Sequence, residues 1–468
     1  MKDPGPGITL DSTRAFCPEC GRTEHALITA RESGVFLERI CPSSGTVGVR
    51  IAGDYRWYLE RTAEPQSVEQ MPNAGRLTRG CPFDCGPCEC HTARLLLPVV
   101  SITNLCNLDC PICFTYNRPD LAYCKTTEEM AAILDHLKSA VGETELINIT
   151  GGEPTLHPGL FELLRLCSDG PFGAVTMNSN GLRIAADRGF AGQLKESGVR
   201  VVLSLHTLDP EKSMVIHGRD VTGEKLRALE VLEELGIPTT ILIVCIRGVN
   251  EEETAELAAR YLTKDFVRGI TIQNMTFTGE NGSRFRPREH VTIDQVEDLL
   301  ATREGFSQSD FFPLGAYHPL CYSAAYYLVS EGRVFPLSRI IDRTLLTAAT
   351  AHSYLLDGGE ELAVPFREGI ERLWSEGVDD EIISLLRRFF REMYPPDRKL
   401  TREERRTAAE SLIKMVHIHP HMDEDNFDIA RVSRCGDLVP DESGRMIPAC
   451  SYNLLYRRQD PRFWKETV

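Results

Sequence analysis

The sequence predicts an α/β fold, in which a partial (β/α)6 barrel follows a cysteine-rich segment and precedes a helical region and a second cysteine-bearing segment. Two observations carry this prediction. Between residue 95 and about residue 277, short runs rich in Val, Ile, Leu and Thr alternate with amphipathic segments, which is typical of a parallel sheet covered by helices. Eleven of the 16 cysteines lie in the first 124 residues, and residues 1–94 show little periodicity, so that part is expected to fold around metals.

Strands and helices alternate regularly in the predicted barrel. Thr126 and Glu129 form a capping box ahead of the apolar stripe Met130, Ile133, Leu134 and Leu137. A second helix is expected with Leu226, Leu229 and Leu232 on its inner face, and it ends at Gly236. The carboxyl ends of barrel strands carry the active site. The six expected strands lie in LLLPVVSIT (95–103), LINIT (146–150), AVTMNSN (174–180), VRVVLSLHT (199–207), TTILIVCIRG (239–248) and GITIQNMTF (269–277).

Composition and charge narrow the class of protein. The formal net charge of −16 argues against a nucleic-acid partner, because a phosphate backbone attracts basic proteins. No basic segment leads into an apolar one at the start, and the longest apolar runs, 95–102 and 241–246, are far shorter than a membrane span. We therefore expect a cytoplasmic protein. Cysteines remain reduced in that compartment, so their clusters indicate metal sites, whereas the isolated Cys167 and Cys245 are expected to be buried.

The strongest motif is CNLDCPICF, which directly follows the first predicted strand. It places Cys106, Cys110 and Cys113 at the barrel mouth in a CxxxCxxC pattern. Three cysteines hold three irons of a [4Fe–4S] cluster and leave the fourth iron open to another ligand. The sequence GGEP (151–154) follows the second strand, where Gly151 and Gly152 let the backbone approach a ligand closely.

Together these motifs strongly resemble the radical SAM superfamily. The resemblance implies that the open iron binds S-adenosylmethionine and that a 5′-deoxyadenosyl radical abstracts hydrogen from the substrate. Cys106, Cys110 and Cys113 would then be the catalytic cluster ligands. The residues expected to contact the cofactor are Phe114, Gly151, Gly152, Glu153, Asn178, Ser179, Ser204 and His206, although the polar residues at strand ends could instead serve only to cap loops.

Flanking cysteines indicate auxiliary clusters. GCPFDCGPC supplies Cys81, Cys85 and Cys88, and this pattern resembles the tetraether synthase family, also described as 7,8-dihydro-6-hydroxymethylpterin methyltransferase-like. The family usually has a further cysteine where this chain has Leu96. Cys90 is the nearest substitute, and His91 and Cys124 are more distant candidates. The ending FDIARVSRCGDLVPDESGRMIPACSYNLLYR also resembles that family, which implies cluster ligation by Cys435 and Cys450, with Cys321 as a further ligand.

Two other groups are open to more than one interpretation. Cys17, Cys20 and Cys41 resemble a rubredoxin-like knuckle that holds one zinc or iron ion, but Ser44 stands where the last ligand is usual. Either His25 or solvent completes the site, or the metal has been lost. In HIHPHMDEDNFD, His417, His419 and His421 are more often a solvated polar stretch than a metal site.

The predicted function is a radical SAM enzyme acting on unactivated C–H positions, with one catalytic and two auxiliary [4Fe–4S] clusters. By the resemblance it couples lipid alkyl chains, and AAYYLV and IISLLRRFF either line an apolar tunnel for them or simply pack in the core. The expected partners are a ferredoxin or flavodoxin as electron donor, and transient contact with a membrane is left open. The alternatives are a pterin-type methyltransferase, a peptide-modifying enzyme, and a non-catalytic iron–sulfur or zinc scaffold. The predicted parts are a rubredoxin-like knuckle (1–62), an auxiliary cluster segment (63–94), the barrel core (95–290), a mostly helical substrate-covering region (291–424) and a C-terminal auxiliary cluster segment (425–468).

Overall fold

The computed structural model describes residues 7–63, 78–86, 88–115, 120–141, 144–330, 332–351, 353–354, 356, 359, 362–378, 380–441 and 444–463. The N-terminal part is a four-stranded antiparallel sheet in the order β1 (Ile8–Cys17), β2 (Arg22–Arg31), β3 (Gly34–Cys41) and β4 (Gly45–Ala52), followed by α1 (Tyr55–Ala63). The sheet has a small apolar core of its own that includes Ile28, Val35 and Leu37. This part was expected to fold around metals rather than a core, but alternating residues such as those of VFLERI supply one.

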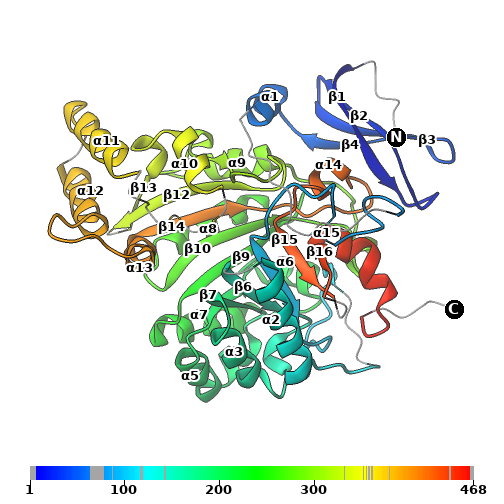
Figure 1. The fold of residues 1–468 in the computed structure, drawn as a ribbon, viewed down its shortest axis with the longest axis horizontal. Helices are drawn as coiled ribbons and strands as arrows, with labels where there is room; N and C mark the ends of the chain where they lie inside the picture. The colour runs from blue at the N-terminus through cyan, green and yellow to red at the C-terminus, as the bar shows by residue number, and fades with distance from the viewer. Residues whose placement is uncertain are drawn as a thin grey trace.

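The predicted partial barrel is confirmed (Figure 1). Its six expected strands pair in parallel with their neighbours, and each buries alternate apolar residues against the surrounding helices. A seventh parallel strand, β14 (Ile413–Ile418), follows at the far edge, where it pairs with the last of the six. The six strands are β5 (Leu97–Ser101), β6 (Thr144–Thr150), β7 (Phe172–Ser179), β8 (Arg200–Ser204), β9 (Thr239–Cys245) and β10 (Val267–Asn274).

The helices of the barrel cover the outside of the sheet (Figure 1). In α2 the predicted capping box forms, since Thr126 N donates to Glu129 Oε2 at 2.7 Å and Glu129 N donates to Thr126 Oγ1 at 3.2 Å. In α7 the predicted stripe is partly wrong: Leu226 is 43% exposed, and Lys225 takes a buried position on the inner face. The helices are α2 (Thr127–Val141), α3 (Leu160–Ser168), α4 (Leu182–Ala186), α5 (Arg188–Glu196), α6 (Pro210–His217), α7 (Thr222–Leu235) and α8 (Glu251–Leu262).

The region after residue 290 contains strands as well as the expected helices. AAYYLV lies in β12 (Ser323–Ser330), which pairs antiparallel with β14 and packs in a second apolar core. The β-branched and aromatic content of AAYYLV is typical of a strand, which the expectation of helix overlooked. The remaining elements are α9 (Ile293–Ala301), β11 (Phe312–Pro313), β13 (Arg333–Pro336), α10 (Arg343–Ala349), α11 (Ala363–Ser375), α12 (Asp380–Met393) and α13 (Arg402–Leu412).

The C-terminal segment joins the N-terminal sheet to the barrel. It runs through α14 (Ile429–Val432), β15 (Asp437–Pro440), β16 (Met446–Pro448) and α15 (Ala449–Ser451) into a π-helical turn (Tyr452–Tyr456). β15 pairs in parallel with the first barrel strand β5, while Phe427 O accepts a hydrogen bond of 3.1 Å from Phe16 N of β1. In Figure 1 the segment accordingly lies between the N-terminal sheet and the barrel.

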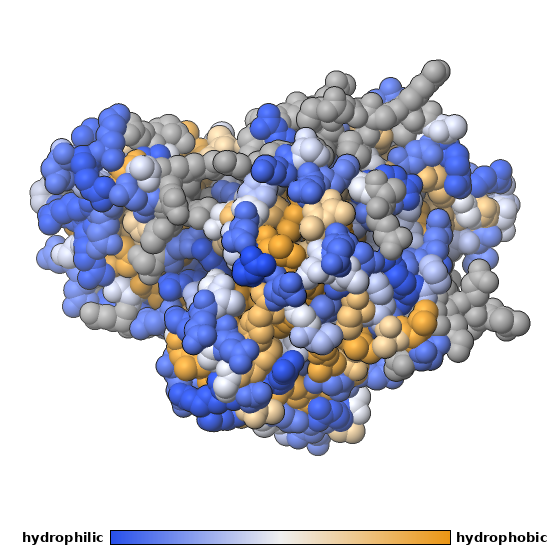
Figure 2. Space-filling model, turned by 60° about the horizontal axis from the view of Figure 1, so that its bottom comes forward, coloured by the Kyte–Doolittle hydropathy of each residue, from blue (hydrophilic) through white to orange (hydrophobic). Residues whose placement is uncertain are grey.

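The chain carries 68 acidic and 52 basic residues, which gives the formal net charge of −16. Figure 2 shows hydrophilic residues around the periphery of one face and apolar residues gathered nearer its centre. Within the residues that the structure describes, no helix combines the length and the apolar character needed to cross a bilayer.

Candidate active site

The three-cysteine loop lies at the carboxyl end of β5 and is held by the segment that follows β10. Gly282 N donates to Cys113 O at 3.0 Å, and Asn281 Nδ2 donates to Cys110 O at 3.1 Å. Gly279 has a φ of +82°, and a Cβ there would lie 2.5 Å from the Phe114 carbonyl carbon. The loop is therefore positioned by two elements far apart in the sequence.

The three thiols fit the expected cluster. Burial raises the pKa of Cys106 and of Cys110 to about 12, and the charge of Cys113 acts in the same direction. Such thiols are protonated at neutral pH unless a metal ion binds them, because coordination deprotonates a thiol. Among the described residues, the sulfur atoms of Cys17, Cys20 and Cys41 all lie within 4.8 Å of one another, whereas those of Cys106, Cys110 and Cys113 lie farther apart. A wider set of three thiols suits a cluster of several irons with one iron left open.

The GGEP sequence is built into the same loop. Gly151 has a φ of +153°, and a Cβ there would lie 2.3 Å from Thr103 O. Gly152 N donates to Thr103 O at 2.8 Å, and Glu153 N donates to Leu105 O at 2.7 Å. The close approach at Gly151 requires glycine, and the backbone hydrogen bonds tie the end of β6 to the residues that lead into Cys106.

The Glu153 carboxylate is a buried brace between β6 and β7. It accepts hydrogen bonds from Thr155 Oγ1 at 2.6 Å, Ser179 Oγ at 2.8 Å and Asn180 N at 2.7 Å, and it is 1% exposed. Burial raises its pKa, while these hydrogen bonds act in the opposite direction. Glu153 and Ser179 are thus hydrogen-bonded to each other, so at the cofactor they would act by positioning other groups.

The other predicted cofactor residues lie in different surroundings. Asn178 and Phe114 face the barrel interior. His206 is buried: its Nδ1 accepts from Val244 N at 3.1 Å and its ring stacks on His217. The carbonyl of Ser204 accepts a hydrogen bond from a lysine side chain. The roles predicted for these residues at the cofactor stay predictions.

That lysine, Lys225, is a candidate functional residue that the sequence analysis missed. Its Nζ donates to Asn180 O and to Ser204 O, each at 2.6 Å, and so joins the ends of β7 and β8. Burial lowers its pKa to about 8, although the neighbouring Cys110, Glu153 and Cys106 favour its charge. The one signal in the sequence was a lysine beside the apolar stripe of α7, where a surface position was the simpler expectation.

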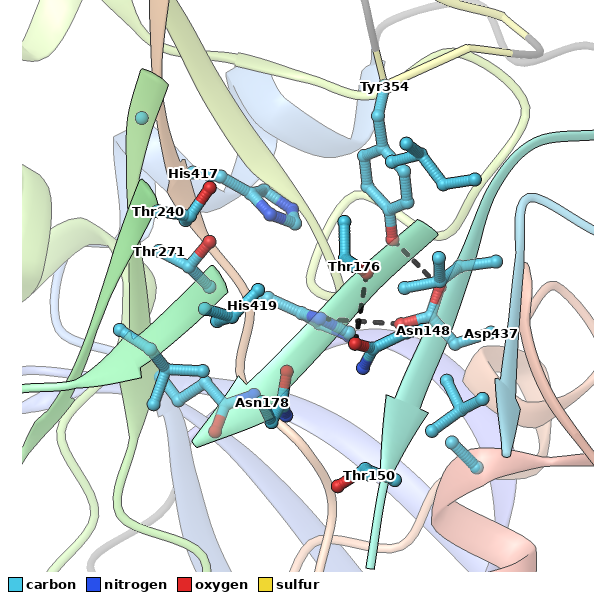
Figure 3. Close-up of a pocket in the computed structure, with 18 of the residues that line it drawn as sticks. Asn148, Thr150, Thr176, Asn178, Thr240, Thr271, Tyr354, His417, His419 and Asp437 are labelled. Atoms are coloured by element: carbon cyan, nitrogen blue, oxygen red, sulfur yellow. Dashed lines mark hydrogen bonds and ion pairs between the residues drawn. The ribbon is translucent and has the colours of Figure 1, made fainter. Parts of the chain in front are cut away.

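A cavity of about 220 Å³ occupies the interior of the barrel. It extends from Arg200 and Arg268, near the starts of their strands, to Thr150 and Asn178 at the strand ends. Figure 3 shows polar side chains from several strands around this space. The polar residues labelled there are Asn148, Thr150, Thr176, Asn178, Thr240, Thr271, Tyr354, His417, His419 and Asp437.

Histidines at and just after the end of β14 form one wall of the cavity, so the expectation of a solvated stretch is wrong. His417 lies in β14, and His419 N continues the pairing with β10 by donating to Ile272 O at 2.8 Å, so the two side chains, two residues apart, face the same side. Burial lowers the pKa of His417 to about 3 and that of His421 to about 4, which makes both neutral. The Nε2 atom of His417 is buried and has no hydrogen-bond partner among the described residues. A ligand in the cavity could supply that partner.

Asp437 of β15 joins this wall to the opposite edge of the barrel. Tyr354 donates its hydroxyl to Asp437 at 2.8 Å, and His419 Nδ1 lies 3.5 Å from the same carboxylate (Figure 3). Burial raises the pKa of Asp437 to about 6. The contacts bridge β14 and β15 across the side of the barrel that the six expected strands leave open.

Cys321, Cys435 and Cys450 are brought together as predicted. All three are buried, and burial raises the pKa of each. Arg431 Nε donates to Cys321 Sγ at 3.3 Å, and His421 Nδ1 lies 3.7 Å from Cys450 Sγ. The charges of Cys450 and Cys321 also raise the pKa of Cys435, which places the three thiols near one another. Three close thiols beside a buried guanidinium fit an anionic iron–sulfur cluster.

The cysteines of GCPFDCGPC form another group. Cys81 shares a hydrogen bond with Cys85, and the charges of Cys85, Cys88 and Cys90 raise its pKa. Cys85 and Cys88 are buried and Cys90 is exposed. The two more distant candidates lie elsewhere: His91 Nε2 is 2.9 Å from Cys435 O, and Cys124 pairs with Thr103. Of the three candidates, Cys90 is the one whose charge acts on Cys81, and its role as a ligand stays a prediction.

The N-terminal knuckle has the spacing of a mononuclear site. The sulfur atoms of Cys17, Cys20 and Cys41 all lie within 4.8 Å of one another. Hydrogen bonding from Ser44 lowers the pKa of Cys41 to about 6. His25 is exposed and does not belong to this group.

A parallel partial barrel with three half-buried thiols at its mouth defines a class of iron–sulfur enzymes. Comparison with known proteins identifies the superfamily within that class. Residues 100–260 match the sequence profile of the radical SAM superfamily. The chain belongs to that superfamily.

Two relatives cover different shares of the chain. The 7,8-dihydro-6-hydroxymethylpterin dimethyltransferase of Methanocaldococcus jannaschii is 25% identical over 96% of this chain and 94% of its own length. The GTP 3′,8-cyclase of Alkaliphilus oremlandii is 31% identical over 45% of this chain and 67% of its own. Among solved structures, SuiB of Streptococcus suis bound to S-adenosylmethionine is 20% identical, with a TM-score of 0.37 over 45% of this chain and 47% of that one.

Proposed function

We propose that this radical SAM enzyme removes a hydrogen atom from a compact, polar ring compound of the reduced-pterin type that is held in the barrel cavity. The observation that carries the proposal is the polar wall formed by His417, His419, Tyr354 and Asp437, where one buried histidine nitrogen has no partner within the described part of the chain. The relative that covers nearly the whole chain is named for a pterin substrate.

The residues at the barrel mouth would hold the cofactors. Cys106, Cys110 and Cys113 would bind the cluster, and Phe114 faces the cavity beside it. When bound, the cluster and S-adenosylmethionine supply the 5′-deoxyadenosyl radical. Glu153 fixes the ends of β6 and β7, and Lys225 fixes those of β7 and β8, so that the loop and the cavity retain their relative positions.

The polarity of the cavity favours a substrate with donors and acceptors. An alkyl chain would offer no partner to the buried Nε2 atom of His417, at a cost of about 1–3 kcal/mol for a buried unpaired group. Asp437 and Tyr354 offer a carboxylate and a hydroxyl side by side. Such a pair can bind the amide and amino edge of a heterocycle.

Coupling of lipid alkyl chains is a second candidate, favoured by one feature of the cavity. The cavity runs along the strands, and apolar side chains such as Leu97, Leu146 and Val202 line part of it. The stretches first expected to line a tunnel, AAYYLV and IISLLRRFF, contribute none of its lining and pack in the second apolar core.

One incubation compares the two substrates. The reconstituted enzyme is given S-adenosylmethionine and dithionite with either a reduced pterin or a phospholipid. We expect 5′-deoxyadenosine to increase with the pterin, and a deuterated pterin to transfer label into it. Label transfer from a deuterated lipid alone, with a product lighter by two hydrogens, would establish lipid coupling instead. A ferredoxin or flavodoxin should replace dithionite, since the cluster needs a low-potential donor.

A variant of the cavity wall tests the binding site itself. Tyr354→Phe removes the hydroxyl that donates to Asp437, and it should raise KM for the pterin while leaving uncoupled cleavage of S-adenosylmethionine intact. Tyr261→Phe is the matched control, because Tyr261 is equally buried but lies on α8 and does not line the cavity. Equal KM values for the two variants would contradict binding at this wall.

A further inference from the structure

The N-terminal knuckle has four candidate ligand positions on two equivalent turns. CPECG (17–21) joins β1 to β2, and CPSSG (41–45) joins β3 to β4. Each turn ends in a glycine with a positive φ, +68° at Gly21 and +71° at Gly45. Ser44 therefore occupies in the second turn the position that Cys20 occupies in the first.

The distances across the two turns are those of one tetrahedral ion. Cys20 Sγ and Cys41 Sγ are 3.8 Å apart, and Cys17 Sγ and Ser44 Oγ are 3.5 Å apart. With metal–sulfur bonds of about 2.3 Å and a metal–oxygen bond of about 2.0 Å, a tetrahedron has S···S and S···O edges of about 3.8 and about 3.5 Å. Both cross-turn pairs match these edges.

Other side chains near the knuckle fit the fourth position less well. His25 is exposed on β2 and lies outside the group of three sulfurs. Glu24 Oε1 is 3.3 Å from Cys20 Sγ, but it does not lie within 4.8 Å of all three sulfurs and pairs with Arg22. Ser44 is thus the oxygen ligand that the geometry offers.

We propose that Ser44 Oγ is the fourth ligand of a mononuclear site that binds one thiophilic ion, Zn²⁺ or iron, through Cys17, Cys20 and Cys41. On binding, the three thiols and the hydroxyl release their protons to solvent as four bonds to the metal form. The site keeps no position open, so it is closed to exogenous ligands. This proposal is independent of the substrate proposed above.

Cobalt(II) substitution in the full chain tests the site. The cobalt spectrum of the Cys20→Ala variant is subtracted from that of the unaltered protein, so that the difference reports on this site and not on the other cysteine groups. We expect one equivalent of tetrahedral cobalt whose spectrum does not change when imidazole is added. In Ser44→Ala, imidazole should change the spectrum and the affinity should fall at least about tenfold. Ser44→Cys should add thiolate charge-transfer intensity. Zinc and iron analysis of the same pair of proteins, as purified, identifies the natural ion.

Ser43→Ala is the matched control, because Ser43 is the exposed neighbour of Ser44 in the same turn and should leave spectrum and affinity unchanged. An imidazole response in the unaltered protein equal to that of Ser44→Ala would place solvent in the fourth position and overturn the proposal. Cobalt binding that does not depend on Cys20 would overturn the site altogether.

Discussion

Ser179 of β7 donates a 2.8 Å hydrogen bond to Glu153 at the end of β6, so the most diagnostic acidic residue of the sequence is a structural brace. Glu153→Ala would leave the donors of Thr155, Ser179 and Asn180 buried without an acceptor. Each costs about 1–3 kcal/mol, and we expect a loss of several kcal/mol in unfolding free energy together with a loss of 5′-deoxyadenosine formation. Calorimetry and product analysis check both effects. Glu162→Ala, on the exposed face of α3, should change neither.

The cysteine groups should have separable roles. Changing Cys106, Cys110 and Cys113 to Ala should remove about four irons and abolish cleavage of S-adenosylmethionine. Changing Cys435 and Cys450 should remove a different cluster, spare uncoupled cleavage and end product formation, because the two sites are built from different elements. Iron quantification decides this, and Cys167→Ala, in the core of α3, serves as the control that keeps all iron. Full iron content and product in the Cys435/Cys450 variant would show those residues to be structural.

Gly151 should tolerate no side chain. In Gly151→Ala the Cβ would meet Thr103 O at 2.3 Å at a φ of +153°, so the loop that leads to Cys106 has to shift. We expect a loss of about 2–4 kcal/mol in stability and a defect in cluster reconstitution. Gly192→Ala, inside α5 with nothing within 4 Å of the added Cβ, should instead stabilise the protein by up to about 1 kcal/mol. Denaturant unfolding of both variants gives the comparison.

His290 should make stability depend on pH. Burial lowers its pKa, but the charge of Asp423, whose Oδ2 lies 2.8 Å from His290 Nε2, and that of Asp425 raise it above the usual value, against the opposing charge of Arg288. The folded state therefore holds the proton more tightly than the unfolded state does. The stabilisation is complete below pH 6.5 and is lost as pH rises through the raised pKa, by about 1.4 kcal/mol per unit of pKa shift.

Thermal unfolding measured from pH 6 to pH 9 checks this prediction. His290→Gln should remove the part of the pH dependence of stability that the His290–Asp423 pair contributes. The pH dependence that comes from other groups should remain. His136→Gln, on α2, should keep the original profile. An unchanged profile in His290→Gln would show that the pair with Asp423 contributes nothing to the pH dependence.

Local pattern was enough to predict the barrel strands and the cluster loop. The six apolar runs became β5 to β10 because a period-2 or continuous apolar run has to be buried wherever it lies. The spacing of Cys106, Cys110 and Cys113 places three thiols on one short loop, whatever the rest of the chain does. The same holds for the helix that begins after Thr126, whose capping box and stripe are contained within a few residues.

Contacts between distant residues required the tertiary structure. β14 enters the sheet beside β10, and only that pairing turns His417 and His419 from an apparently polar stretch into a cavity wall. Likewise β15 pairs with β5, which brings Asp437 to Tyr354. Lys225 is buried because two backbone carbonyls from other strands satisfy its amine. The sequence by itself determined which segments bury their apolar faces and which cysteines are close along the chain. The tertiary structure alone decided which polar groups meet inside, because their partners lie tens to hundreds of residues apart and leave no periodic signal.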